Sequence, residues 1–136
     1  MKFRRIPQIM AVLFAAALFI SFGEPTFDAS SAESFRQSFL DVKAGLETDA
    51  QRDVLDEAHK AVVVYTALAI GVEKQESGDY SEGKPDEETI MAYLDKTVDG
   101  MTAVEFAAYA DEVGPKRVDM FKQLMRNSFQ KSFGDR

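Results

Sequence analysis

A long apolar stripe with helical spacing lies near the middle of the chain and limits the folds that the chain can adopt. Its members recur at alternating intervals of four and three residues, the spacing of one face of an α-helix. From Ala61 to Val72 the chain is almost entirely apolar, so this helix is expected to lie centrally. Val62 to Tyr65 has strand propensity by itself, but the sustained spacing and the alanines favour a helix. The stripe comprises Val54, Ala58, Ala61, Tyr65, Leu68 and Val72, broadened by Leu55, Val62 and Ala69.

Start and stop signals divide the rest of the chain into further helices. Residues 30–33, 48–51 and 102–105 each have the pattern of a capping box, with Ser or Thr followed three positions later by Glu or Gln. Pro85 and the acids after it suit a helix start, and Gly-Pro at 114–115 suits a helix end followed by a new start. The apolar residues expected to face inward are Phe35, Phe39, Val42 and Leu46; Ile90, Met91 or Leu94, and Val98; Val104, Ala107, Ala108 and Val113; and Val118, Phe121, Leu124, Met125, Phe129 and Phe133.

These elements predict an all-α fold, a compact antiparallel bundle of about five helices. No internal repeat or flexible linker divides residues 24–136, which are expected to form one helical domain. The chain has no cysteine, so no disulfide can staple this domain and its core must hold it.

The first 23 residues have the three parts of a secretion signal. Three basic residues precede an apolar run at 9–22, which is shorter than the roughly 20 apolar residues of a spanning helix. Ser21 and Gly23 suit signal-peptidase cleavage after Gly23. We therefore expect residues 1–23 to be a signal peptide and the protein to be exported, periplasmic or membrane-associated in a bacterial envelope. An uncleaved anchor or a buried N-terminal helix is the alternative.

Charge is distributed unevenly along the expected domain. From Glu24 to Pro115 there are seven Lys and Arg against 21 Asp and Glu, a net charge of −14. From Lys116 to Arg136 there are six Lys and Arg against two Asp, a net charge of +4. Residues 24–136 together carry a net charge of −10, which disfavours nucleic acid or anionic lipid as a partner of the whole domain.

No pattern of residues predicts catalysis or metal binding. His59 is the single histidine, with Asp56 three residues before it and no nucleophile motif anywhere in the chain. Asp49, Asp53 and Glu57 recur four apart, but they lack the histidine spacing of metal-binding helices and read as a solvated acidic face. We therefore predict a protein that is not an enzyme, with no catalytic residue, no cofactor and no metal.

The loop from residue 79 resembles a calcium-binding loop only superficially. Its glycine, Gly83, falls at the fifth position instead of the sixth, and Pro85 occupies the seventh. The twelfth position is Ile90, where a bidentate Glu would be needed. The sequence therefore predicts no calcium site here.

The last helix carries the one candidate functional surface. Lys122, Met125, Arg126, Phe129 and Phe133 combine basic and bulky apolar side chains, as in helices that lie on an anionic membrane or contact a partner. The competing interpretation, which we favour from the sequence, is that the Phe face packs into the bundle while the charges complement the acidic body.

Two stretches resemble an uncharacterised family of small all-helical bacterial lipoproteins. Residues 25–35, Pro-Thr-Phe-Asp-Ala-Ser-Ser-Ala-Glu-Ser-Phe, are similar to the mature start of that family. Residues 94–106 resemble its second signature, a Gly-x-Thr-x-x-Glu helix start after a short helix. The likeness covers roughly residues 24–113 and implies export and a helical fold, without an activity. Such lipoproteins carry a lipid-acceptor Cys at the end of the apolar run, where this chain has Phe22.

From these features we predict an exported envelope protein that acts as a non-enzymatic module and binds another envelope protein through its helical surfaces. The alternative is a membrane-peripheral protein that uses the basic, Phe-rich C-terminal helix.

Overall fold

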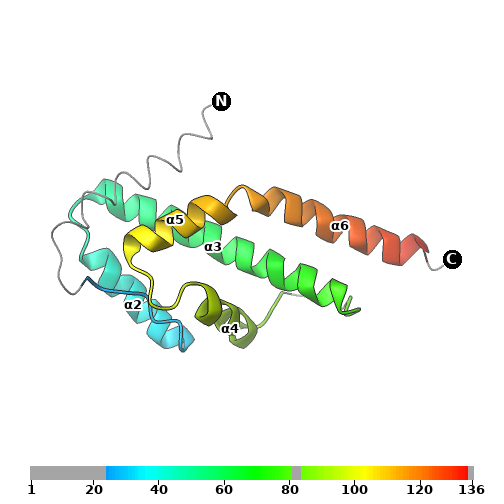
Figure 1. Cartoon of the computed structure of the whole chain (residues 1–136), viewed down its shortest axis with the longest axis horizontal. Helices are drawn as coiled ribbons and strands as arrows, with labels where there is room; N and C mark the ends of the chain where they lie inside the picture. The colour runs from blue at the N-terminus through cyan, green and yellow to red at the C-terminus, as the bar shows by residue number, and fades with distance from the viewer. Residues whose placement is uncertain (1–23, 81–83, 135–136) are drawn as a thin grey trace, which may run out of the picture.

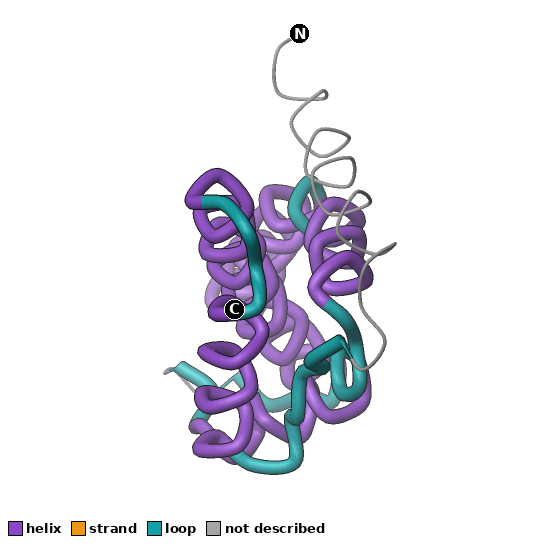
Figure 2. Tube along the Cα trace, turned by 90° about the vertical axis from the view of Figure 1, so that its left-hand side faces the viewer, coloured by secondary structure: helices purple, strands orange, loops and turns teal. Residues whose placement is uncertain are grey.

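The computed structural model describes residues 24–80 and 84–134 and folds them into five α-helices (Figure 1). They are α2 (Ala32–Ala44), α3 (Asp49–Glu76), α4 (Glu87–Thr97), α5 (Ala103–Val113) and α6 (Lys116–Gly134). Figure 2 shows only helices and loops in this part of the chain. The predicted all-α fold of about five helices is therefore confirmed. The predicted signal peptide at 1–23 lies outside the described residues, and the single domain over 24–136 stays a prediction.

The helix α2 begins one residue later than the sequence indicated. Ser31 is its N-cap, and the Ser31 hydroxyl accepts a hydrogen bond from the backbone N–H of Ser34 at 3.0 Å. The capping box predicted from Ser30 and Glu33 is therefore wrong. The Ser30 hydroxyl and backbone N–H both donate to the Asp28 carboxylate, at 2.6 and 3.0 Å, which holds Ser30 in the turn before the helix.

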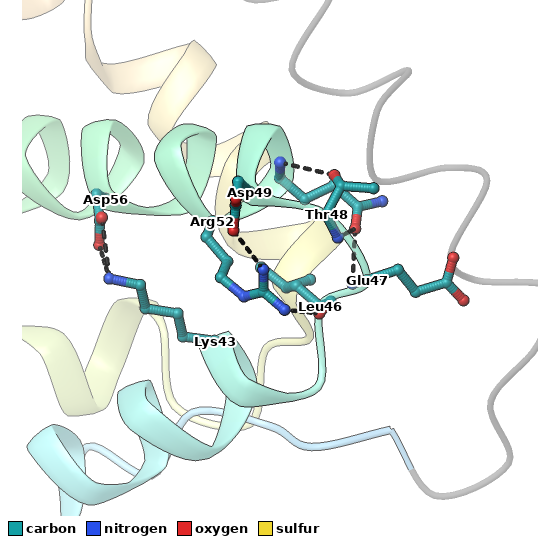
Figure 3. Close-up of polar contacts among 8 residues, drawn as sticks. Lys43, Leu46, Glu47, Thr48, Asp49, Arg52 and Asp56 are labelled. Atoms are coloured by element: carbon teal, nitrogen blue, oxygen red, sulfur yellow. Dashed lines mark hydrogen bonds and ion pairs between the residues drawn. The ribbon is translucent and has the colours of Figure 1, made fainter.

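A tight connection then folds α3 back against α2, with the two helices antiparallel (Figure 3). The predicted capping box at Thr48 and Gln51 is confirmed, because each side chain bonds to the backbone N–H of the other residue. Beyond the connection, the Lys43 ammonium donates to both carboxylate oxygens of Asp56 at 3.0 Å. This half-exposed ion pair ties the last turn of α2 to the second turn of α3.

The residues before α2 (24–31, the N-terminal segment) are built into the core. The Phe27 N–H donates to the Met101 carbonyl at 2.9 Å, and the Phe27 carbonyl accepts from the Gly100 N–H at 2.7 Å. The Phe27 side chain is 1% exposed and stacks on Phe106 with ring centroids 4.3 Å apart. The sequence did not reveal these two core residues, because neither belongs to an expected helical stripe.

The helices α4 and α5 complete this core. Asp86 caps α4, and the capping box predicted at Thr102 and Glu105 is confirmed. The inward face of α5 is rotated from the expected one, so that Phe106 is fully buried while Ala108 is exposed. The large Phe106 ring determines this rotation, since burying it removes far more apolar surface from water than burying a methyl group.

The buried residues of these elements form one cluster, which we call the core region. It contains Phe27, Ala29, Phe35, Val42, Leu46, Leu55, Ala58, Val62, Leu94, Val98, Ala103, Phe106, Ala107, Ala110 and Val113. The cluster draws on the N-terminal segment, α2, the first half of α3, α4 and α5. Among the described residues, no member comes from α6.

The last helix instead packs along the second half of α3, and we call this unit the α3–α6 pair (Figure 1). A Cβ at Gly71 would lie 3.1 Å from Leu124 Cδ2, so the glycine allows Leu124 to approach the α3 backbone closely. Further along, the Gln75 amide donates to the Leu124 carbonyl and to the Ser128 hydroxyl, at 3.3 and 3.1 Å. Residue numbers rise together along both helices, so α6 runs in the same direction as α3. The expected antiparallel order holds for α2 and α3 but not for this pair.

Candidate docking surface on α6

The outward face of α6 carries five large apolar side chains, which we call the α6 ridge. The exposed fractions are 59% for Val118, 55% for Phe121, 44% for Met125, 56% for Phe129 and 60% for Phe133. Their spacings of three and four residues align them along one side of the helix. The other exposed large hydrophobics of the described residues lie on other elements and are Leu40, Val64 and Tyr80.

The expectation that this Phe face packs into the bundle is wrong. The half-buried residues of α6, which face the body, are Arg117, Met120, Gln123, Leu124 and Asn127. The Asn127 amide donates to Gln75 Oε1 at 3.1 Å, which adds a polar contact to those made by the Gln75 amide. Since an α-helix turns about 100° per residue, a helix seated on Leu124 and Asn127 directs Phe121, Met125 and Phe129 away from α3. The face that packs is therefore more polar than the face that is exposed.

All five residues of the sequence-predicted face are exposed together on this side of α6: Lys122, Met125, Arg126, Phe129 and Phe133. Lys122 and Arg126 lie among and beside the residues of the ridge and form no ion pair among the described residues. The single acid of α6 is Asp119, in the first turn. The exposed face thus combines unpaired positive charge with bulky apolar groups.

The other cations of α6 contact the body instead. Lys116 lies 3.7 Å from a carboxylate oxygen of Glu112, and Arg117 Nε donates to the Gly114 carbonyl at 2.9 Å. The Lys131 ammonium lies 5.6 Å from the ring centroid of Tyr80. Lys122 and Arg126 are distinct from these three because they are free to meet an external group.

Near the end of α6 the ridge is locally ordered. The rings of Phe129 and Phe133 stack with centroids 5.8 Å apart and planes 9° from parallel. The two residues are one helical turn apart, so their rings form a single flat apolar surface.

None of the described helices is both long enough and apolar enough to cross a membrane.

His59 is half-buried between aromatic rings. Its ring centroid lies 4.7 Å from that of Phe39 and 6.0 Å from that of Phe35. Burial lowers the pKa of His59, and the negative charge of Asp56 opposes this effect only in part. Asp56 itself is held by Lys43, so the carboxylate that the sequence placed beside the histidine has another partner. His59 therefore lies partly within the aromatic packing between α2 and α3 and is not a fully solvated side chain.

The three spaced acids of α3 are engaged in local contacts or with solvent. Asp49 accepts from Arg52 at 2.8 Å, and Glu57 accepts from Lys60 at 3.2 Å. Asp53 is exposed. Within the part of the chain that the structure describes, no three or more acids and histidines are grouped so that they could hold a metal ion.

One acid on the body has an unusual environment. Asp111, on α5 beside the core region, is half-buried, and burial raises its pKa to about 6.

Elsewhere on the body, a shallow groove of about 560 Å³ lies between the N-terminal segment and α4. The charged residues that line this groove are Glu87, Glu88 and Asp95.

The chain matches no protein-family model, and the comparisons with curated proteins and with solved structures give no match. The resemblance to small bacterial lipoproteins therefore stays a prediction.

Proposed function

We propose that this chain is a small non-enzymatic protein of the bacterial envelope, which acts by docking the α6 ridge against another surface. The proposal joins the predicted export signal to one structural observation: the most apolar face of α6 is turned outward. The protein-binding module predicted from the sequence and its membrane-peripheral alternative both use this element.

Five aligned apolar side chains on one outward face are more than the scattered single hydrophobics of an ordinary protein surface. Removing apolar surface from water is worth about 25 cal/mol per Å², so covering the ridge supplies a substantial driving force for association. Because the five side chains project from one straight helix, they reach an external surface together.

The ridge is also held in place before any partner arrives. Leu124 seats against Gly71, and the Gln75 amide joins α3 to Leu124, Asn127 and Ser128. Docking therefore does not have to order α6, and preorganisation of this kind favours binding by lowering its entropic cost. The core region acts as the rigid support from which the ridge projects.

Site-specific photo-crosslinking in living cells tests the proposal. A benzophenone amino acid is placed at Phe129 in the full chain, and in a matched control at Leu40, which is exposed to the same extent (57% against 56%) but lies on α2. We expect a protein or lipid adduct from position 129 and none from position 40. Equal labelling at both positions, or no adduct at position 129, would contradict the assignment of α6 as the docking element.

A further inference from the structure

We infer that the surface covering the α6 ridge is an anionic lipid membrane, on which α6 lies flat. The inference rests on the proposed function and names the partner class of the same site. It follows from the charge beside the ridge, from the shape of the ridge, and from the poorer fit of a second copy of the chain to the ridge.

Positive charge is placed where a lipid headgroup would meet it. Lys122 and Arg126 lie beside the exposed Met125 and Phe129 and form no ion pair among the described residues. A cation next to an apolar face can contact a headgroup phosphate while its neighbours enter the acyl boundary. Each Lys or Arg near an anionic surface contributes about 1 kcal/mol of attraction.

The charge of the whole protein orients this contact. Residues 24–115 carry a net charge of −14, whereas residues 116–136 carry +4. A negative membrane surface repels the body and attracts the C-terminal segment, so the approaching protein turns α6 toward the lipid. The acidic body is repelled by the same membrane, so contact in any other orientation is disfavoured.

The ridge has the shape of an interfacial helix. From Val118 to Phe133 it extends about 22 Å along the axis of α6, at 1.5 Å per residue. Its bulky side chains project from a convex helix surface, which suits insertion by about 5–10 Å below the headgroups. The contacts to α3 use the opposite face, so a membrane-bound α6 keeps all of them.

A second copy of this chain is a poorer occupant. A standard protein interface involves about 20–30 residues from each partner, whereas the ridge supplies five apolar side chains. Two copies joined through α6 would also bring together two segments that each carry +4. The charge that opposes self-association is the same charge that favours an anionic surface.

Vesicle co-sedimentation tests the inference. Every core contact described lies between Phe27 and Val113, so a protein beginning at Glu24 retains the core region; its cooperative thermal unfolding is checked first. We expect binding to phosphatidylglycerol-containing vesicles at low salt, weaker binding at 0.5 M NaCl, and no binding to phosphatidylcholine vesicles. The double variant K122Q/R126Q should bind about 30-fold more weakly, since it lacks two cations worth about 1 kcal/mol each. The matched control K60Q/K96Q removes two exposed cations from other helices and should bind as wild type.

The outcomes separate the inference from the proposed function. No binding to anionic vesicles, together with a protein adduct from position 129 in cells, overturns the lipid inference and leaves α6 as the docking element. A dimer in sedimentation equilibrium that Phe129→Asp converts to a monomer assigns the ridge to a second copy and also overturns the inference. Absence of any adduct at position 129 contradicts the proposed function itself. If the protein beginning at Glu24 does not fold, the nature of the adduct formed by the full chain, lipid or protein, decides between the same outcomes.

Discussion

The two halves of α3 hold their neighbouring helices in different ways. In the core region, α2, α5 and the N-terminal segment enclose the first half of the helix, and Leu55, Ala58 and Val62 are fully buried. In the α3–α6 pair, the second half of α3 contacts α6 through Leu124 and the Gln75 amide, and the apolar ridge of α6 is exposed. Apolar residues at helical spacing are thus buried on the first half of α3 but exposed on the outward face of α6.

Such an apolar stripe is therefore buried only where enough neighbouring elements surround it. A helix with one neighbour buries one face, and packing, polar contacts and charge determine which face that is. In α6 the inward face makes specific contacts to Gln75 and Gly71, and the outward face is left for a partner. Four substitutions test this contrast between the core region and the α3–α6 pair.

The largest effect is expected from Phe27→Ala in the core region. It removes a ring that is 1% exposed and stacked on Phe106, leaving a cavity among Phe35, Phe39 and Phe106. The free energy of unfolding should fall by about 3–5 kcal/mol, measured by urea denaturation. Leu40→Ala is the control, because that exposed side chain should contribute less than about 0.5 kcal/mol. A small loss for Phe27→Ala would mean that the N-terminal segment is not part of the core.

The α3–α6 pair should respond separately to Gln75→Ala. The change removes three hydrogen bonds between the helices, each with a net worth of about 0.5–1.5 kcal/mol when fully buried. Because the site is partly exposed, we expect the local opening free energy of α6 to fall by about 1–2 kcal/mol. Amide hydrogen exchange should show faster exchange in α6 and unchanged protection in α5. A uniform loss of protection in both helices would show that the two regions unfold as one unit.

A pH-dependent effect is expected from Asp111→Asn on the edge of the core region. Burial raises the pKa of Asp111 from 3.8 to about 6, so the folded state binds more protons than the unfolded state between these values. The free energy of unfolding contributed by this group is therefore present at low pH and falls as the pH rises through that window. The Asn variant should be more stable than wild type by about 1 kcal/mol at pH 7.5, allowing for partial solvent screening, and should gain nothing at pH 3.5.

Urea denaturation of both proteins at the two pH values measures this difference. Asp119→Asn serves as the matched control, because Asp119 is exposed on α6. An equal gain at both pH values would show that the carboxyl of Asp111 is not held in a partly dry site.

The smallest effect on stability is expected from Phe129→Ser in the ridge. More than half of this side chain is exposed, so the free energy of unfolding should change by less than about 0.5 kcal/mol. The same substitution should reduce binding to anionic vesicles, and it thereby separates the ridge from the core region. A loss of stability comparable to that of Phe27→Ala would instead mean that Phe129 belongs to a packed core.

Much of the fold could be predicted because its signals are local. The capping boxes at Thr48 and Thr102, the break at Gly114-Pro115 and the apolar spacing of α3 each depend on residues within one or two helical turns. The start of α2 was misplaced by one residue, since Ser30 and Ser31 are both good caps and the contact to Asp28 decided between them. The candidate face was also found locally, from the basic and Phe-rich pattern of residues 122–133.

What could not be predicted depends on residues far apart in the chain. Phe27 is held by Met101, Gly100 and Phe106, more than 70 residues away, and no local pattern identifies it as core. His59 is half-buried because two Phe rings of α2 fold over it. The side of α6 that faces the body is chosen by Gly71 and Gln75, about 50 residues earlier.

The helical class, most helix ends and the separation of an acidic body from a basic last helix thus follow from the amino-acid sequence alone. These properties follow from backbone capping, apolar spacing and charge, which act between near neighbours or simply add along the chain. Which apolar stripes are buried, and that the α6 ridge is exposed, depends on the packing of the helices against one another. A stripe requires a partner surface to leave water, and the number and position of those surfaces are set by how distant segments pack.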